Sequence, residues 1–271
     1  MRPIRLSALR SIMHEIAING WGILVETHND FSLWRLIEYP RMTEYLELER
    51  GDRVLDLGSG TSTYPLMLCR EGIDVVVVEI DLARVRWQQA QVARGMAGAG
   101  RLDVIVADAS ALPIRSAMFR RVTSISAIEH MDDDRAVGSE ISRVLRRGGI
   151  AAISVPYTKS ERHTFFAGLK PFKQVRRNEF VQEGKGSLVR FYTDADIEAR
   201  FGRGAGCRIT KRSFFGRTIL NDWYHESRLN RYWRSFILKD LLLALTVYPL
   251  EEWLLRRQEP FDIMFQIERT D

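Results

Sequence analysis

Short apolar segments alternate with helical segments between residues 53 and 156, and this alternation constrains the fold more than any other feature. The second segment contains four consecutive valines, Val75–Val78, a run that is typical of a strand buried on both faces. Five such segments predict strands: Arg53–Leu57, Asp74–Ile80, Leu102–Ala107, Arg121–Ser126 and Ile150–Val155. The repeated strand–helix order predicts a parallel sheet with helices on both faces, an α/β fold.

Helical periodicity fills the intervals between these strands. Apolar residues at three- and four-residue spacing predict helices over Tyr64–Arg70, Leu82–Ala97 and Asp133–Arg147. The third of these begins with an acidic turn and ends with Arg146–Arg147 before Gly148–Gly149. Both ends therefore complement the helix dipole, and the glycines are expected to cap the helix.

The segments outside this core follow other patterns. Leu6 to Leu48 has helical spacing interrupted at Pro40, so we expect a helical N-terminal cap over residues 1–50. Residues 157–190 contain scattered aromatics without a regular period, which predicts a loop excursion that serves as a lid. Thr193 is the expected N-cap of a helix through Arg200. The remaining expectations are strands at Cys207–Phe214 and Phe261–Glu268, with a helical insertion over 216–258.

Composition excludes several classes of protein. With 271 residues, 45% of them hydrophobic, the chain is too apolar for intrinsic disorder. Its net charge of +5 is too small to require a nucleic-acid partner. Cys69 and Cys207 cannot form a disulfide framework, so we expect a reducing, cytoplasmic location. The apolar run Leu241–Leu250 is shorter than the roughly 18 residues of a membrane span, and polar residues break the apolar stretch near the N-terminus, so neither an anchor nor a signal peptide is expected.

The first predicted strand ends in a glycine-rich turn that has a carboxylate before it. Gly58 and Gly60, on either side of Ser59, allow the backbone to approach a ligand, and the following helix offers amide N–H groups to an anion. Asp56 would repel a pyrophosphate, which disfavours a dinucleotide. A ligand with a cationic head fits better, and S-adenosylmethionine carries both an ammonium and a sulfonium group.

Two further carboxylates end the next two predicted strands. Glu79 lies 19 residues after Gly60, where an acidic side chain can accept from both ribose hydroxyls. Asp108, followed by Ala109, can accept from an adenine amine at the same level. Each carboxylate alone fits a helix cap or a solvated loop. Together with Asp56 they line the crevice in which open parallel sheets bind ligands.

These motifs resemble those of the class I S-adenosylmethionine-dependent methyltransferases, the broad group that includes quinone-pathway and many small-molecule enzymes. In chain order over Arg53–Pro156 the matching segments read VLDLGSGTS, VVVVEID, VIVADASALPIRSAMF, VTSISAIEHM and ISRVLRRGGIAAISVP. The resemblance implies a Rossmann-like, seven-stranded, mostly parallel sheet with an antiparallel last strand. It also implies a methyltransferase domain over residues 51–271 and S-adenosylmethionine as cofactor.

The resemblance assigns a part of the cofactor to each motif. The methionine end would lie at Asp56 and the glycine turn, the ribose at Glu79, the adenine at Asp108, and the methyl group near Ser126. The implied cofactor-binding residues are Asp56, Gly58, Ser59, Gly60, Glu79, Ile80, Asp108, Ala109 and Ser126. Some quinone O-methyltransferases have a metal-binding glutamate three residues before a Glu–His pair; Ser126 takes that position here, so no metal is expected.

Methyl transfer is an in-line displacement in which the enzyme mainly positions the reactants, and a hydroxyl acceptor also needs a base. His130, just after the fourth strand, is the candidate base because its ordinary pKa of roughly 6.5 suits proton transfer. Equally, His130 and Glu129 fit a role in capping or orienting the adjoining loop. Tyr157 and His163 are weaker candidates.

The sequence constrains the acceptor less than the cofactor. The Asn/Asp-Pro-Pro-Tyr signature of adenine-N6 methyltransferases is absent, which disfavours nucleic acid. Aromatics, leucines and spaced arginines in residues 223–257 fit peripheral contact with anionic lipid or an entrance for a lipid-like substrate. They fit equally a helical hairpin packed on the core or across a dimer interface. We expect methyl transfer to a small, hydrophobic or lipid-like molecule; the alternatives are an RNA methyltransferase and a non-catalytic S-adenosylmethionine-binding protein.

Overall fold

In the described part of the chain, the central sheet has seven strands in the order β10-β11-β5-β4-β1-β2-β3. The computed structural model describes residues 4–19, 33–167, 170–182, 188–217 and 260–270. Its central strands are β1 (Arg53–Leu57), β2 (Asp74–Glu79), β3 (Leu102–Val106), β4 (Phe119–Ile125), β5 (Leu145–Pro156), β10 (Cys207–Arg217) and β11 (Pro260–Arg269). β11 runs antiparallel to both of its neighbours, whereas the pairs from β5 to β3 are parallel. The predicted Rossmann-like sheet is therefore confirmed.

Side chains of the central strands alternate between two cores. From β1 and β2, one face receives Leu55, Leu57, Val76 and Val78, and the opposite face receives Val54, Val75 and Val77. This alternation follows from the two-residue period of a strand. Because both faces are buried, the run of valines needs no polar side.

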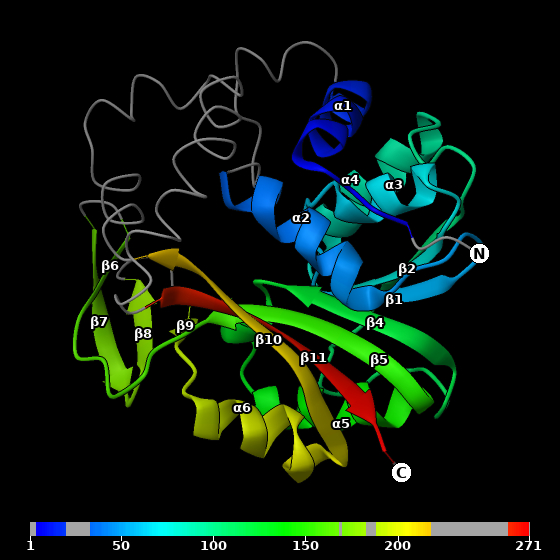
Figure 1. Ribbon diagram of the computed structural model, residues 1–271. Helices are drawn as coiled ribbons and strands as arrows, with labels where there is room; N and C mark the ends of the chain where they lie inside the picture. Colours follow the sequence, from blue (N-terminus) through cyan, green and yellow to red (C-terminus); the bar gives the residue numbers. More distant parts are fainter. Residues whose placement is uncertain (1–3, 20–32, 168–169, 183–187, 218–259, 271) are drawn as a thin grey trace.

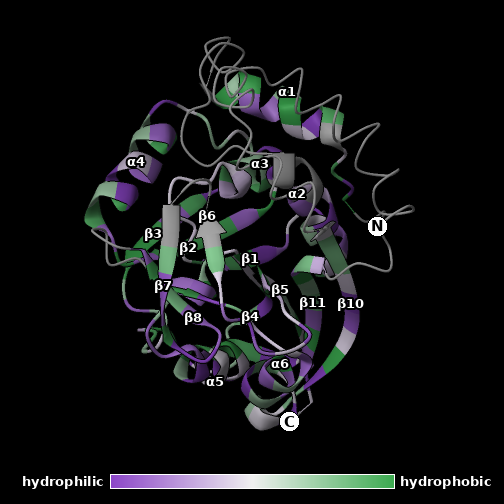
Figure 2. Cartoon of the chain, turned by 90° about the vertical axis from the view of Figure 1, so that its left-hand side faces the viewer, coloured by the Kyte–Doolittle hydropathy of each residue, from purple (hydrophilic) through white to green (hydrophobic). Residues whose placement is uncertain are grey.

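Helices cover both faces of the sheet (Figure 1). One face packs against α1 (Ala8–Asn19), α2 (Leu33–Leu46), α3 (Tyr64–Arg70) and α4 (Leu82–Ala93), and the other against α5 (Asp134–Val144) and α6 (Asp194–Phe201). Figure 2 shows hydrophilic and hydrophobic residues side by side along α1 and α4, as expected for helices with one packed face. Tyr39 and Met42 of α2 share a core with Tyr64 of α3, so the N-terminal helices pack directly on the sheet layer.

Three predicted helix boundaries are wrong. The helix predicted over Leu82–Ala97 ends at Ala93, with Arg94 as its C-cap. Pro40 does not interrupt the N-terminal helical segment but lies inside α2, between the buried residues Tyr39 and Met42. The helix predicted to reach Arg147 ends at Val144, and β5 begins at Leu145. Leu145 is fully buried and pairs with Phe119 of β4, so strand pairing replaces the last helical turn. Gly148, at φ +70°, lies where the register between β4 and β5 shifts.

The predicted loop excursion over 157–190 is instead largely a second sheet. Its antiparallel strands are β6 (Phe165–Ala167), β7 (Lys170–Arg176), β8 (Glu179–Gln182) and β9 (Leu188–Arg190), in that order. Phe165, Phe180 and Phe191 form its buried core, with ring centroids 5.0 Å apart for Phe165 and Phe191. The strands are too short for a period to be read in sequence, and the aromatic contacts that hold them are non-local.

The end of the chain agrees with expectation where it is described. Thr193 is the N-cap of α6, and its hydroxyl and the Asp196 carboxylate form a reciprocal capping box. The insertion predicted over 216–258 lies outside the described residues except for Gly216 and Arg217, which end β10. Two short 3₁₀ helices, η2 (Ile128–His130) and η3 (Arg203–Ala205), complete the described elements. Among the helices of these residues, none is both long and apolar enough to span a bilayer.

Replacing Phe180, which is fully buried, tests the independence of the small sheet. We expect Phe180→Ala to destabilise β6–β9 by about 3–5 kcal/mol, because the lost ring leaves a cavity. Native-state hydrogen exchange should show lost protection in β6–β9 and retained protection in β1, β2 and β4. Val175→Ala, at an exposed position of β7, is the matched control and should change little. Uniform loss of protection over both sheets would contradict this separation.

Candidate functional site

A cavity of about 450 Å³ opens where the carboxyl ends of β1, β2, β3 and β4 meet. Its walls include seven of the residues singled out from the sequence: Gly58, Glu79, Ile80, Asp108, Ala109, Ser126 and His130. They come from segments spread over more than 70 residues of chain, and parallel pairing brings them to one edge. Asp56, Ser59 and Gly60 lie outside the lining of this cavity.

The turn after β1 requires glycine at its first position. Gly58 has φ +71° and Gly60 φ +58°, a region that side chains with a Cβ rarely adopt. A Cβ on Gly58 would lie 2.8 Å from Ala127 Cβ and 3.0 Å from Met131 Cε. Glycine is therefore required at position 58 both by the backbone conformation and by the close packing of Ala127 and Met131 against the turn.

Backbone amides orient the Glu79 carboxylate. One oxygen accepts from Gly60 N–H at 2.9 Å, and the other accepts from Ile80 N–H at 2.9 Å and Asp81 N–H at 3.0 Å. Glu79 is 4% exposed and lines the cavity. The side chain therefore holds the glycine turn and faces the cavity at once, with its rotamer set before a ligand binds.

Asp56, in β1 just before the glycine turn, has a raised pKa. Burial, reinforced by the Glu79 carboxylate and opposed by Arg35, raises the pKa of Asp56 to about 7. Its side chain is 3% exposed. A carboxyl group with this pKa favours a nearby positive charge, because a cation would offset its desolvation. Asp56 is therefore partly protonated near neutral pH in the free protein, and a nearby cation would favour its ionised form.

Asp108 and Ala109 follow β3 at the opposite side of the cavity. One oxygen of Asp108 accepts from Ser110 N–H at 2.8 Å, which fixes the turn after the strand. Ile80 is 65% exposed beside it, so an apolar side chain faces solvent at the cavity rim. An apolar surface beside a hydrogen-bond acceptor fits a purine ring.

Ser126 has a strained backbone that is held from α2. Its φ is +46°, and its N–H donates to Ser154 O at 3.1 Å. Its hydroxyl donates to Glu38 Oε1 at 3.0 Å, as the Ser154 hydroxyl does at 2.9 Å. Arg35 Nη1 donates to the other oxygen of Glu38 at 2.7 Å. Sequence reasoning missed Glu38, because nothing in the local pattern places α2 over the end of β4.

Gln88 is a second residue that sequence reasoning missed. It is fully buried on α4, and its amide lies 3.2 Å from Gly60 O, 3.0 Å from Ser62 O and 3.3 Å from Ser59 Oγ. Gln88 therefore fixes the glycine turn from behind. Its spacing from Val85 and Val92 places it on the inward face of α4, and that was the available signal.

The structure separates the three candidate proton acceptors. His130 lines the cavity, with Nδ1 bound to Leu188 O and Nε2 3.9 Å from Glu129 Oε1. Burial raises the pKa of Glu129, and its Oε2 has no hydrogen-bond partner among the described residues. Tyr157 is buried and donates to Asp194 Oδ2 at 3.0 Å, away from the cavity lining. His163 is exposed and also lies outside that lining.

Within the described part of the chain, no group of His, Cys, Asp and Glu side chains is arranged to hold a metal ion.

The buried Asp56 predicts a pH dependence of stability. Its pKa in the folded state is about 7 against an ordinary 3.8, so the native state binds more protons than the unfolded state between these values. The free energy of unfolding should therefore fall as the pH rises from about 4 to about 7. At pH 8 Asp56→Asn should be more stable than the unmodified protein by up to about 4 kcal/mol, since one pKa unit corresponds to about 1.4 kcal/mol.

Urea unfolding of Asp56→Asn between pH 4 and 8 measures this effect, with the exposed Asp74→Asn as control. The free energies of unfolding of Asp56→Asn and of the unmodified protein should become similar near pH 4. A stability difference that does not vary with pH would contradict the burial argument.

The Glu38 contacts predict a second effect on stability. Glu38→Ala leaves the Ser126 and Ser154 hydroxyls and Arg35 without their shared acceptor, so we expect a loss of about 3–5 kcal/mol. Glu38→Gln keeps an acceptor oxygen and should lose about half of that. Urea denaturation compares both with Glu44→Ala, an exposed position of the same helix. Equal effects of Glu38→Ala and Glu44→Ala would show that the network contributes nothing.

Comparison with known proteins agrees with this geometry. Residues 55–153 match the family model of a methyltransferase domain. The chain is 32% identical over 117 residues to an O-methyltransferase of Aspergillus nomiae. The alignment covers 41% of this chain and 49% of that relative. It is 26% identical over 198 residues to a demethylmenaquinone methyltransferase of Clavibacter sepedonicus, covering 70% of this chain and 77% of the relative.

A solved structure shows the same fold. An S-adenosylmethionine-dependent methyltransferase from Mesorhizobium loti aligns with a TM-score of 0.58 at 15% identity, over 88% of this chain and 100% of that one. At this identity the likeness concerns the fold alone. The match to the Aspergillus relative spans about half of that protein, so acceptor and partners do not follow from it. Residues 55–153 are thus similar to a methyltransferase domain, and the motifs that meet at this sheet edge resemble those of the class I S-adenosylmethionine-dependent methyltransferases.

Proposed function

We propose that this protein transfers the methyl group of S-adenosylmethionine to a small-molecule acceptor. The observation that carries the proposal is the cavity bounded by the Gly58 turn, Glu79 and Asp108, with Ser126 at its inner wall. Two curated relatives support this proposal: one is named an O-methyltransferase, and the other is named for methylation of demethylmenaquinone, a small molecule.

The residues of the cavity divide the binding work. The glycine turn would receive the methionine end of the cofactor, with the negative charge of Asp56 behind it. Glu79, held by three backbone N–H groups, would accept from the ribose hydroxyls, and Asp108 with Ala109 would face the adenine. When bound, the cofactor supplies an electrophilic methyl group for in-line displacement. The chain's own contribution is to hold the reactants in place and exclude water.

His130 is our proposed proton acceptor for a hydroxyl nucleophile. Because its Nδ1 bonds to the Leu188 carbonyl, the neutral ring carries its N–H there and leaves Nε2 as the acceptor. The ring lines the cavity with its side chain about half exposed, so a bound acceptor can reach it. Tyr157 and His163 are not used in this proposal.

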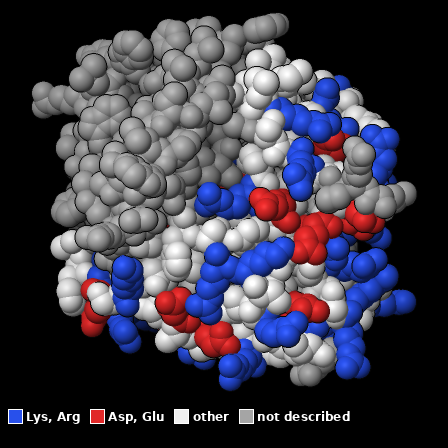
Figure 3. All heavy atoms as spheres, in the orientation of Figure 1, with Lys and Arg blue, Asp and Glu red and all other residues white. Residues whose placement is uncertain are grey.

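The character of the acceptor is proposed from the sequence alone. The aromatics, leucines and arginines of residues 223–257, outside the described residues, support a hydrophobic or lipid-like acceptor. We also propose that residues 1–50 form a helical cap on a methyltransferase domain over residues 51–271. In Figure 3, Lys and Arg lie beside Asp and Glu over much of the described part of the face in view.

Binding of S-adenosylhomocysteine, followed by calorimetry, tests the cofactor part of the proposal. Glu79→Ala should weaken binding at least about tenfold, a loss of about 1.4 kcal/mol, because it removes the acceptor for the ribose. Asp74→Ala is the matched control, since Asp74 lies at the other end of the same strand. Thermal unfolding confirms that both variants are folded. Unchanged affinity in Glu79→Ala would remove Glu79 from the site.

Transfer of a tritiated methyl group into fractionated cell extract tests the acceptor. We expect label in the lipid or small-metabolite fraction. Label confined to RNA would contradict the proposal, and cofactor binding without any transfer would favour a non-catalytic role. Flotation with anionic liposomes tests whether residues 223–257 contact lipid. If they do, reversing the charges of Arg228, Arg231 and Arg234 should abolish flotation of the protein.

A further inference from the structure

One wall of the cofactor cavity belongs to no long helix or strand. Residues 130–133 run from the end of η2 to the start of α5, and all four line the cavity. Met131 packs directly against the glycine turn, since a Cβ on Gly58 would lie 3.0 Å from Met131 Cε. Backbone carbonyls in such irregular chain need hydrogen-bond partners from other parts of the protein.

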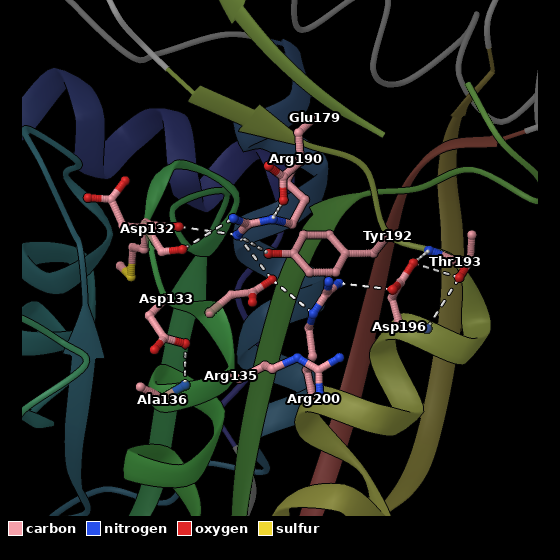
Figure 4. A network of polar contacts seen from close by, with 12 residues as sticks. Asp132, Asp133, Arg135, Ala136, Glu179, Arg190, Tyr192, Thr193, Asp196 and Arg200 are labelled. Atoms are coloured by element: carbon pink, nitrogen blue, oxygen red, sulfur yellow. Dashed lines mark hydrogen bonds and ion pairs between the residues drawn. The ribbon is translucent and has the colours of Figure 1, made fainter. Parts of the chain in front are cut away.

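Arg190, the last residue of β9, makes two contacts to the backbone of this wall. Its Nη1 donates to Met131 O at 3.1 Å and its Nη2 donates to Asp132 O at 3.4 Å (Figure 4). One strand residue therefore binds the carbonyls of two successive wall residues. The neighbouring Leu188 carbonyl of β9 binds His130 Nδ1, so β9 contacts three consecutive residues of the wall.

The guanidinium of Arg190 is buried and remains charged. Burial opposes the charge, but Tyr192, Glu179 and Asp134 outweigh it, and the pKa of Arg190 lies above its ordinary value. Arg190 Nε bonds to Glu179 Oε1 at 2.9 Å, and Nη1 lies 3.0 Å from Asp134 Oδ2. The side chain is 4% exposed. The planar guanidinium thus donates at the same time to Glu179 of β8, to Asp134 of α5 and to the wall carbonyls. A lysine has a single ammonium group and cannot reach all three.

We propose that Arg190 is a positioning residue for the cofactor: from the small sheet it sets the backbone of residues 130–133 and so the shape of the cavity wall beside the glycine turn. The inference rests on the assignment of this cavity to S-adenosylmethionine and does not depend on which acceptor is methylated.

Arg200 provides a matched control from the same network (Figure 4). It lies on α6, and its Nε is 3.2 Å from the same Asp134 carboxylate, while Nη1 is 3.1 Å from Asp196. Its guanidinium lies over the Tyr192 ring at 5.3 Å. Within the described residues it has no hydrogen bond to the carbonyls of the wall. Replacing Arg200 thus disturbs the shared ion pair and leaves the wall contacts in place.

Calorimetry with S-adenosylhomocysteine on Arg190→Lys and Arg200→Lys tests the proposal, with thermal unfolding of both. We expect Arg190→Lys to weaken binding roughly 3- to 30-fold. Arg200→Lys should lower the midpoint of thermal unfolding to a similar extent while its affinity stays within about twofold of the unmodified protein. A purely structural role would move the unfolding midpoint of Arg190→Lys but not its affinity, and that result would overturn the proposal.

Hydrogen exchange of the unmodified protein decides the matter if Arg190→Lys does not fold. Saturation with S-adenosylhomocysteine should slow exchange in residues 130–134 and in 188–192 together, because the two segments share the Arg190 contacts. Protection of the wall with no change in β9 would overturn the proposal. If the unmodified protein binds no S-adenosylhomocysteine, this proposal and the cofactor assignment both fall. Binding without methyl transfer leaves this proposal intact and contradicts only the proposed reaction.

Discussion

The parallel pairing of β1 with β2 and β4 is the constraint on which the site depends. Leu57 pairs with Val78, and Asp56 with Thr123, so the carboxyl ends of these strands finish at one level. A shift of register would move Glu79 away from the Gly60 N–H that it accepts, and the turn would lose its support. Asp74 and Glu79 flank the valine run, so a slip by one residue would bring a charged side chain to a position that a buried valine now occupies.

The walls of the cavity are held by elements that lie outside it. Glu38 reaches from α2 to the strained Ser126, Gln88 reaches from α4 to the glycine turn, and Arg190 reaches from β9 to the chain after η2. Each uses one polar side chain with several donors or acceptors to satisfy buried groups that irregular backbone leaves open. The cavity is therefore a product of the whole α/β layer and the small sheet, although the residues that line it are few.

Two buried charges in the structure have opposite character. Arg190 is surrounded by Glu179, Asp134 and backbone carbonyls, so its charge is compensated and serves to fix geometry. Asp56 has the Glu79 carboxylate as a neighbour and Arg35 as a partial counter-charge, so its charge is poorly compensated in the free protein. An uncompensated buried charge favours binding of a cation, whereas a compensated one favours a single conformation. The character of Asp56 therefore fits the binding of a cationic ligand, and that of Arg190 fits the positioning of backbone.

The sequence by itself determined the central sheet and the residues at its edge. The valine run of β2, the glycines after β1, the acid that ends β2 and the acid that follows β3 are local patterns, and each needs only its neighbours in the chain to be interpreted. Tertiary structure alone decided the rest. The short strands β6–β9 are held together by contacts among Phe165, Phe180 and Phe191, which are distant in the sequence. Leu145 pairs with Phe119 of β4, so β5 begins where a further helical turn was predicted. Glu38 and Arg190 lie 88 and 59 residues from the wall residues they bind, so no local period could have revealed them. Local periodicity reports how a segment is buried, while the partner of a buried polar group is fixed only when distant segments pack.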